Sequence, residues 1–122
     1  MAPRILVVED NEKNRVLVRD VLVLFGYEVL EAKDGLEGIS MAVEHGPGLI
    51  LMDIQMPVLS GVEAMKRLRE HPETRRIKII AVTSFAMKGD REKLLDAGFD
   101  DYIPKPIDPI ELPDIVKKYL PV

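Results

Sequence analysis

LILMDIQMP, the stretch from Leu49 to Pro57, decides the fold class that the sequence predicts. Four bulky apolar residues run without interruption into a carboxylate, Asp53. Such a run indicates a strand that is covered on both faces, as the central strands of a parallel sheet are. Asp53 would then lie at the carboxyl end of this strand, where ligands bind in open α/β sheets. From this stretch alone, a solvated loop aspartate is an equally good interpretation.

The composition indicates one globular domain, which we expect to span residues 1–122. A chain of 122 residues with 47% hydrophobic content can bury one core. Its 17 Lys and Arg against 21 Asp and Glu give a net charge of -4, and without a basic run we expect no nucleic-acid partner. The absence of cysteine fits a reducing compartment. The first apolar run, Ile5 to Val8, is too short for a signal sequence or a membrane span, so we expect a soluble, cytoplasmic protein.

Five segments predict strands, three of them largely apolar, and a helical pattern follows each of them. The strands are expected at Ile5–Val8, Tyr27–Ala32, Leu49–Asp53, Ile77–Val82 and Asp101–Ile103. The helices are expected between Asn11 and Phe25, from Gly35 to His45, at Val62–Glu70, at Met87–Ala97, and between Asp108 and Leu120. The second and fifth strands have mixed polarity, which places them at the edges of the sheet.

Two of these helices carry expectations that depend on single residues. The first helix should turn one stripe toward the core, consisting of Leu17, Val18, Val21, Leu22 and Phe25. The last helix should be capped by Asp108, with Pro109 in its first turn and Glu111 completing a capping box. Pro113 lacks the N–H that would bond to Pro109, so we expect a distorted first turn or a late start.

The strict alternation of strands and helices predicts a doubly wound α/β fold of the flavodoxin-like type. Right-handed crossovers would place all five strands in one parallel sheet with the order 2-1-3-4-5. Polar residues then follow the strands at one edge of this sheet: Glu9, Asp10, Asp53, Thr83 and Lys105. Independent surface residues would rarely converge in this way, which favours a functional site over a solvated loop.

The chemistry of these residues indicates phosphoryl transfer. Three crowded carboxylates repel one another, and a hard divalent cation with oxygen ligands, above all Mg²⁺, relieves that repulsion. A cation, the Lys105 ammonium and the Thr83 hydroxyl around the Asp53 carboxylate would neutralise charge and position a nucleophile. Taken alone, Thr83 is more typical of a strand-end hydroxyl, so the interpretation depends on the whole set.

Four stretches of the chain resemble the receiver domains of two-component response regulators. They are VVEDN at 7–11, LMDIQMPVLSG at 51–61, VTSFAMKGD at 82–90 and DDYIPKP at 100–106. The resemblance covers the whole chain and implies the (βα)5 receiver fold. It is greatest to single-domain regulators of the DivK type and to the receivers of hybrid histidine kinases.

The resemblance implies a role for each site residue. Asp53 would accept the phosphoryl group, and Thr83 and Lys105 would hold its oxygens. Mg²⁺, or Mn²⁺ in its place, would bind Asp10, Asp53 and the backbone carbonyl of Gln55, with Glu9 nearby through water.

The resemblance also implies three features around the site. Tyr102 matches the aromatic position that changes rotamer together with Thr83 on activation. The Lys105–Pro106 peptide bond is typically cis in receivers. Gln55 and Phe85 would flank the path by which water reaches the phosphorus.

The implied function is that of a phosphorelay response regulator. The phosphoryl group would come from a phosphohistidine of a histidine kinase or histidine phosphotransfer protein. The signal would pass to a downstream protein target by direct binding, without a DNA-binding output domain. We expect no membrane partner. The protein would be no enzyme beyond its own aspartyl phosphorylation and dephosphorylation. Two alternatives stay open: a receiver excised from a hybrid histidine kinase, and a receiver-like adaptor that is not phosphorylated.

Two functions from other classes fit the sequence less well. A haloacid-dehalogenase-like phosphatase also uses a strand-end aspartate, but it needs a second aspartate two residues later, where this chain has Gln55. A flavodoxin-type cofactor binder needs a phosphate loop rich in glycine and hydroxyls after the first strand. This chain has Glu9 and Asp10 there, which would repel phosphate.

Replacing Phe85 with alanine or glutamate should shorten the half-life of the phosphorylated protein by about ten-fold, equivalent to about 1.4 kcal/mol of barrier. An aromatic ring excludes water and offers it no hydrogen bond, so its removal opens the path to the phosphorus. The decay of the phosphorylated protein measures the effect, with unchanged Mg²⁺ affinity as the control. Equal half-lives for the wild type and both variants would leave Phe85 a packing residue.

Overall fold

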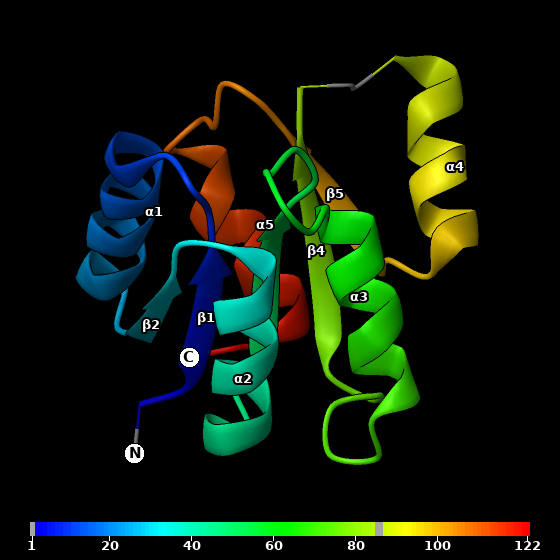
Figure 1. The fold of residues 1–122 in the computed structure, drawn as a ribbon. Helices are drawn as coiled ribbons and strands as arrows, with labels where there is room; N and C mark the ends of the chain where they lie inside the picture. Colours follow the sequence, from blue (N-terminus) through cyan, green and yellow to red (C-terminus); the bar gives the residue numbers. More distant parts are fainter. Residues whose placement is uncertain (1, 85–86) are drawn as a thin grey trace.

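A five-stranded parallel sheet between two layers of helices forms the centre of the molecule (Figure 1). The computed structural model describes residues 2–84 and 87–122. The strands are β1 Arg4–Val8, β2 Glu28–Ala32, β3 Leu49–Asp53, β4 Lys78–Thr83 and β5 Asp101–Pro104. The helices are α1 Glu12–Leu24, α2 Gly35–His45, α3 Gly61–Glu70, α4 Lys88–Ala97 and α5 Glu111–Tyr119. Phe85 lies outside the described residues, so its role stays a prediction.

The strand order is β2-β1-β3-β4-β5 with all neighbours parallel, which confirms the predicted topology. The register fixes where the strands end relative to one another. Val8 pairs with Met52 and Asp53 pairs with Val82, so Asp53 lies one position beyond the last residue of β1. Thr83 pairs with Pro104 at the same edge. The carboxyl ends of β1, β3, β4 and β5 therefore lie at the same edge of the sheet.

The apolar run that ends in Asp53 is buried on both faces of the sheet. Leu49 and Leu51 belong to the core that α1 and α5 cover. Ile50 and Met52 belong to the core on the side of α2, α3 and α4. Burying a large apolar side chain contributes about 1.5–3 kcal/mol, which explains why β3 has no polar residue before its end. No helix in the described part of the chain is long and apolar enough to cross a membrane.

The inward stripe of α1 is narrower than the sequence predicted. Val18 and Leu22 are fully buried, whereas Leu17 is 44% exposed and Phe25 is 41% exposed. Phe25 lies beyond the last helical residue as the C-cap, where its ring faces the ammonium of Lys117 at 5.3 Å. The predicted stripe was too wide because only the residues that point directly at the sheet are covered.

The expected late start of the last helix is confirmed, and Asp108 caps the turn that leads into it. α5 begins at Glu111, and Ile110 directly before it already has helical φ and ψ angles. Oδ1 of Asp108 accepts from the Ile110 N–H at 2.8 Å and the Asp108 carbonyl accepts from the Leu112 N–H at 3.0 Å, as expected of an N-cap residue, whereas the described residues show no hydrogen bond from the Asp108 N–H to Glu111 that would complete the capping box. A start at Pro109 would have required an N–H from Pro113, which proline lacks. The late start places Pro113 in the first turn, where a helix leaves its N–H groups without internal partners.

Gly61→Ala should lower the free energy of unfolding by about 2 kcal/mol, because a Cβ at this position has no room. It would overlap the carbonyl oxygen of Asp53 and lie 2.9 Å from the Cα of Ile54. Gly89→Ala in α4 is the matched control, since a Cβ there meets nothing within 4 Å and alanine favours a helix. Urea unfolding compares the two variants, and equal stability of both would contradict this close approach.

Candidate functional site

Three carboxylates meet at the carboxyl edge of the sheet. Glu9 and Asp10 follow β1 directly, and Asp53 ends β3. One carboxylate oxygen from each lies within 4.8 Å of the other two. Glu9 is 4% exposed and Asp53 is 1% exposed, whereas Asp10 is exposed to solvent. The predicted convergence of these residues is therefore confirmed.

The Lys105 ammonium bridges two of these acids. Its Nζ lies 3.1 Å from Oε1 of Glu9 and 3.1 Å from Oδ1 of Asp53. Burial lowers the pKa of Lys105, but the hydrogen bonds and negative charges of Asp53 and Glu9 outweigh burial and raise this pKa above its ordinary value. Lys105 is therefore charged at neutral pH, and it neutralises one of the three negative charges.

Backbone N–H groups hold the two buried acids in place. Oε2 of Glu9 accepts from the Asn11 N–H at 3.1 Å, and Oδ1 of Asp53 accepts from the Gln55 N–H at 3.1 Å. Oδ2 of Asp53 is buried and has no hydrogen-bond partner within the described part of the chain. A buried polar atom without a partner costs about 1–3 kcal/mol, so this oxygen marks a place where a ligand would restore a lost interaction.

The donor set fits a hard divalent cation. Three carboxylates and one ammonium leave a net charge of about two negative units on a small volume, and carboxylate oxygens are the ligands that Mg²⁺ prefers. Oδ2 of Asp53, which belongs to one of these carboxylates, has no hydrogen-bond partner in the described residues and is available to a cation. The residues present thus match the requirements of a magnesium site.

The remaining predicted residues lie around this centre. Thr83 is buried at the end of β4, and its carbonyl accepts from the Lys105 N–H at 2.8 Å. Gln55 is exposed at the start of the loop after β3. The Lys105–Pro106 bond is cis, as the resemblance implied. Tyr102 is half-buried on β5, with the guanidinium carbon of Arg91 5.6 Å from its ring centroid, and its rotamer change stays a prediction.

Arg15 is a site residue that the sequence did not identify. Its Nη1 donates to the backbone carbonyl of Glu9 at 3.0 Å, and its Nε lies 3.2 Å from Oε1 of Glu31. Arg19 contacts the other oxygen of Glu31 at 3.2 Å. Arg15 thus ties the acidic loop to β2. A long, flexible side chain on α1 could point in several directions, so its position in the sequence did not reveal this contact.

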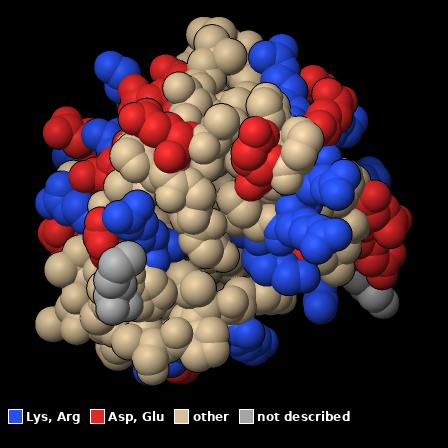
Figure 2. Space-filling view, turned by 90° about the horizontal axis from the view of Figure 1, so that it is seen from below, with Lys and Arg blue, Asp and Glu red and all other residues tan. Residues whose placement is uncertain are grey.

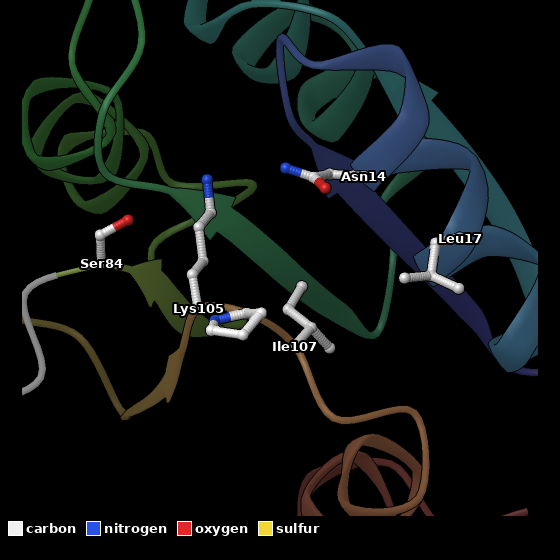
Figure 3. Close-up of a pocket in the computed structure, with 6 residues that line it drawn as sticks. Asn14, Leu17, Ser84, Lys105 and Ile107 are labelled. Carbon is white, nitrogen blue, oxygen red and sulfur yellow. The ribbon is translucent and has the colours of Figure 1, made fainter.

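A cavity of about 340 Å³ opens beside Lys105 (Figure 3). It is lined by Asn14, Leu17, Ser84, Lys105, Pro106 and Ile107. Asn14 and Leu17 come from α1, and they face Ile107 in the loop after β5 across the opening. Leu17 is exposed because it borders this cavity and does not pack against the sheet. The cavity leaves the outer side of Lys105 accessible.

The sequences of known proteins match this chain over almost its whole length. Residues 5–117 match the family described as response regulator receiver domain. The polar-differentiation response regulator DivK of Brucella ovis is 47% identical over 120 residues, which cover 98% of this chain and 98% of that protein.

Two solved structures share the fold. The receiver domain of sensor histidine kinase PA1611 from Pseudomonas aeruginosa has a magnesium ion coordinated in its active site cleft; it is 38% identical, with a TM-score of 0.89 over 98% of both chains. The chemotaxis response regulator CheY4 of Vibrio cholerae is 27% identical, with a TM-score of 0.92 over 98% of this chain and 100% of that chain.

Asp53→Asn should raise the free energy of unfolding by roughly 1 kcal/mol in a buffer that contains a chelator. The amide keeps an oxygen for the Gln55 N–H, but it removes a buried charge that faces two other carboxylates. Glu31→Gln is the matched control, because Glu31 faces two arginines, each at 3.2 Å, and its neutralisation should lower the stability. Urea unfolding measures both effects. A loss of stability in both variants would argue against net repulsion in the site.

Proposed function

The chain belongs to the response regulator receiver family, and on this premise we propose that Asp53 accepts a phosphoryl group from a phosphohistidine. The observation that carries this proposal is the difference between the contacts of the two carboxylate oxygens of Asp53. Lys105 and the Gln55 N–H hold Oδ1, whereas Oδ2 is buried without a partner in the described residues. One oxygen is thus fixed by its contacts while the other is available as a nucleophile.

In the proposed reaction, an oxygen of Asp53 forms a bond to the phosphorus of the donor. The phosphorus–nitrogen bond of the phosphohistidine breaks, and its electron pair stays on the imidazole nitrogen. Lys105 already lies 3.1 Å from Oδ1, so its ammonium is placed to pair with a phosphoryl oxygen on Asp53. Thr83, buried at the end of β4, would donate its hydroxyl to another phosphoryl oxygen. Such preorganised donors stabilise developing charge without reorganisation.

The acidic cluster would hold the cation that this reaction needs. Asp10, Asp53 and the Gln55 carbonyl would bind Mg²⁺ or Mn²⁺, with Glu9 nearby through water. A bound divalent cation neutralises charge on the phosphoryl oxygens and orients them. Arg15 would support this arrangement, because it holds the Glu9 carbonyl and thereby the loop that carries Asp10.

The partners follow from this chemistry. The donor would be a histidine kinase or a histidine phosphotransfer protein, and the cavity beside Lys105 leaves the site open on that side. The phosphorylated protein would act in the cytoplasm by binding a downstream protein, as a single receiver domain without enzymatic output. The resemblance to DivK supports a single-domain regulator, and the resemblance to the receiver of a sensor histidine kinase keeps a hybrid kinase as the second candidate.

Asp53→Asn should abolish Mg²⁺-dependent labelling of the protein by radioactive acetyl phosphate, because the amide cannot act as the nucleophile. Asp96→Asn, an exposed carboxylate on α4, is the matched control and should be labelled like the wild type. Omission of the divalent cation should prevent labelling of the wild type and of the Asp96 variant. Persistent labelling of the Asp53 variant would disprove the assignment, and an unlabelled wild type would favour the adaptor that is not phosphorylated.

A further inference from the structure

Basic side chains gather at the amino end of the sheet, opposite the carboxylate site (Figure 2). The sequence has no uninterrupted basic run, but six of its 17 Lys and Arg lie in residues 66–78, together with only two of its 21 Asp and Glu. This segment therefore has a formal charge of +4, whereas the rest of the chain has -8. Figure 2, which shows this end of the molecule, has a continuous patch of Lys and Arg to the right of centre.

The loop between α3 and β4, residues 71–77, is held rigidly by Arg69. Its Nη1 donates to the carbonyls of Arg75 and Ile77, and its Nη2 donates to the Gly98 carbonyl at 3.1 Å and to Oδ2 of Asp100 at 2.9 Å. Asp100 also accepts from the Ile79 N–H at 2.8 Å. The Arg69 guanidinium is therefore paired within the fold, and it holds in place the backbone that carries the neighbouring cations.

Thr74 fastens the same loop from the other side. It is fully buried, and its hydroxyl donates to the Leu68 carbonyl at 2.6 Å. The Arg75 N–H bonds to the His71 carbonyl at 2.9 Å, and the Ile77 N–H bonds to the Thr74 carbonyl at 3.1 Å. The loop therefore presents its side chains from a fixed backbone, which lowers the entropy lost when a partner binds.

Three cations of this loop and of the start of β4 form what we call the basic patch: Arg75, Arg76 and Lys78. Arg75 and Arg76 are exposed, and neither has a side-chain hydrogen bond or ion pair in the part of the chain that the structure describes. Lys78 is 56% exposed and lies 3.7 Å from Asp100. Cations often stabilise the C-terminus of a helix, but α3 ends at Glu70, so this explanation does not apply to the patch.

We propose that the basic patch binds an acidic segment of a partner protein. Guanidinium groups form paired hydrogen bonds with carboxylates, and two adjacent exposed arginines provide two such groups. The patch lies at the opposite end of the sheet from Asp53, so the same molecule can bind this segment and receive a phosphoryl group. The interaction goes beyond the proposed phosphoryl transfer and does not depend on it.

A short acidic protein segment fits the patch better than a long polyanion or a membrane does. Electrostatic attraction fades beyond about 8–10 Å at physiological salt, and outside the 66–78 segment the chain carries a formal charge of -8. Glu70 and Glu73 lie within the segment and further limit its positive area. An extended nucleic acid or an anionic bilayer would also meet the Asp and Glu side chains that Figure 2 shows elsewhere on this face, whereas a few carboxylates in a flexible segment would not.

The test measures binding of a fluorescein-labelled peptide in which Asp and Glu alternate with Ser. Fluorescence anisotropy should show binding to the full chain that weakens between about 50 and 300 mM salt. Arg75→Gln with Arg76→Gln should weaken binding by about ten-fold. Lys117→Gln with Lys118→Gln is the matched control, because it removes an adjacent pair of exposed cations from α5 and should change binding by less than about two-fold.

Further measurements separate the patch from the phosphoryl site and from other partners. Both double variants should remain folded in the binding buffer and be labelled by acetyl phosphate like the wild type, so loss of peptide binding cannot reflect a damaged Asp53 site. Absence of peptide binding at low salt, or an equal loss in both variants, would overturn the proposal. Tighter Arg75- and Arg76-dependent binding of an oligonucleotide or of phosphatidylglycerol vesicles would overturn the choice of partner.

Discussion

The carboxylate of Asp53, buried at the end of the central strand, determines which groups must surround it. Asp53 is 1% exposed, and a buried charge is tolerated only when it is paired and hydrogen-bonded. Lys105 provides the opposite charge from the loop after β5, and the Gln55 N–H provides a hydrogen bond from the loop after β3. Because the same ammonium also contacts Glu9, one cation joins the ends of β1, β3 and β5.

The two ends of the sheet satisfy their polar groups in different ways. At the amino end, Arg69 and Asp100 complete their hydrogen bonds within the fold and clamp the loop between α3 and β4. At the carboxyl end, Glu9 and Asp53 share the Lys105 ammonium while Asp10 lies beside them, and Oδ2 of Asp53 has no partner in the described residues. Incomplete satisfaction of buried groups is typical of functional sites, and here it lies where parallel sheets bind ligands.

The sequence predicted those features that depend on burial and topology. The apolar run before Asp53 required a strand covered on both faces, and strict alternation then set the strand order that brings Glu9 and Asp10 to Asp53. Features that depend on individual side-chain directions could not be predicted. Leu17 has the spacing of a core residue but borders a cavity, and only the folded structure places Arg15 against the Glu9 carbonyl.

The first turns of α1 connect the acidic loop to the cavity beside Lys105. The Asn11 side chain caps the helix by accepting from the Asn14 N–H at 3.0 Å, while the Asn11 N–H donates to Glu9. Arg15 holds the Glu9 carbonyl from one side of the helix, and Leu17 borders the cavity beside Lys105. Only the C-terminal half of α1 is anchored by fully buried side chains, since Val18 is its first. The packing of this half therefore positions the residues of α1 that contact the acidic loop and those that line the cavity.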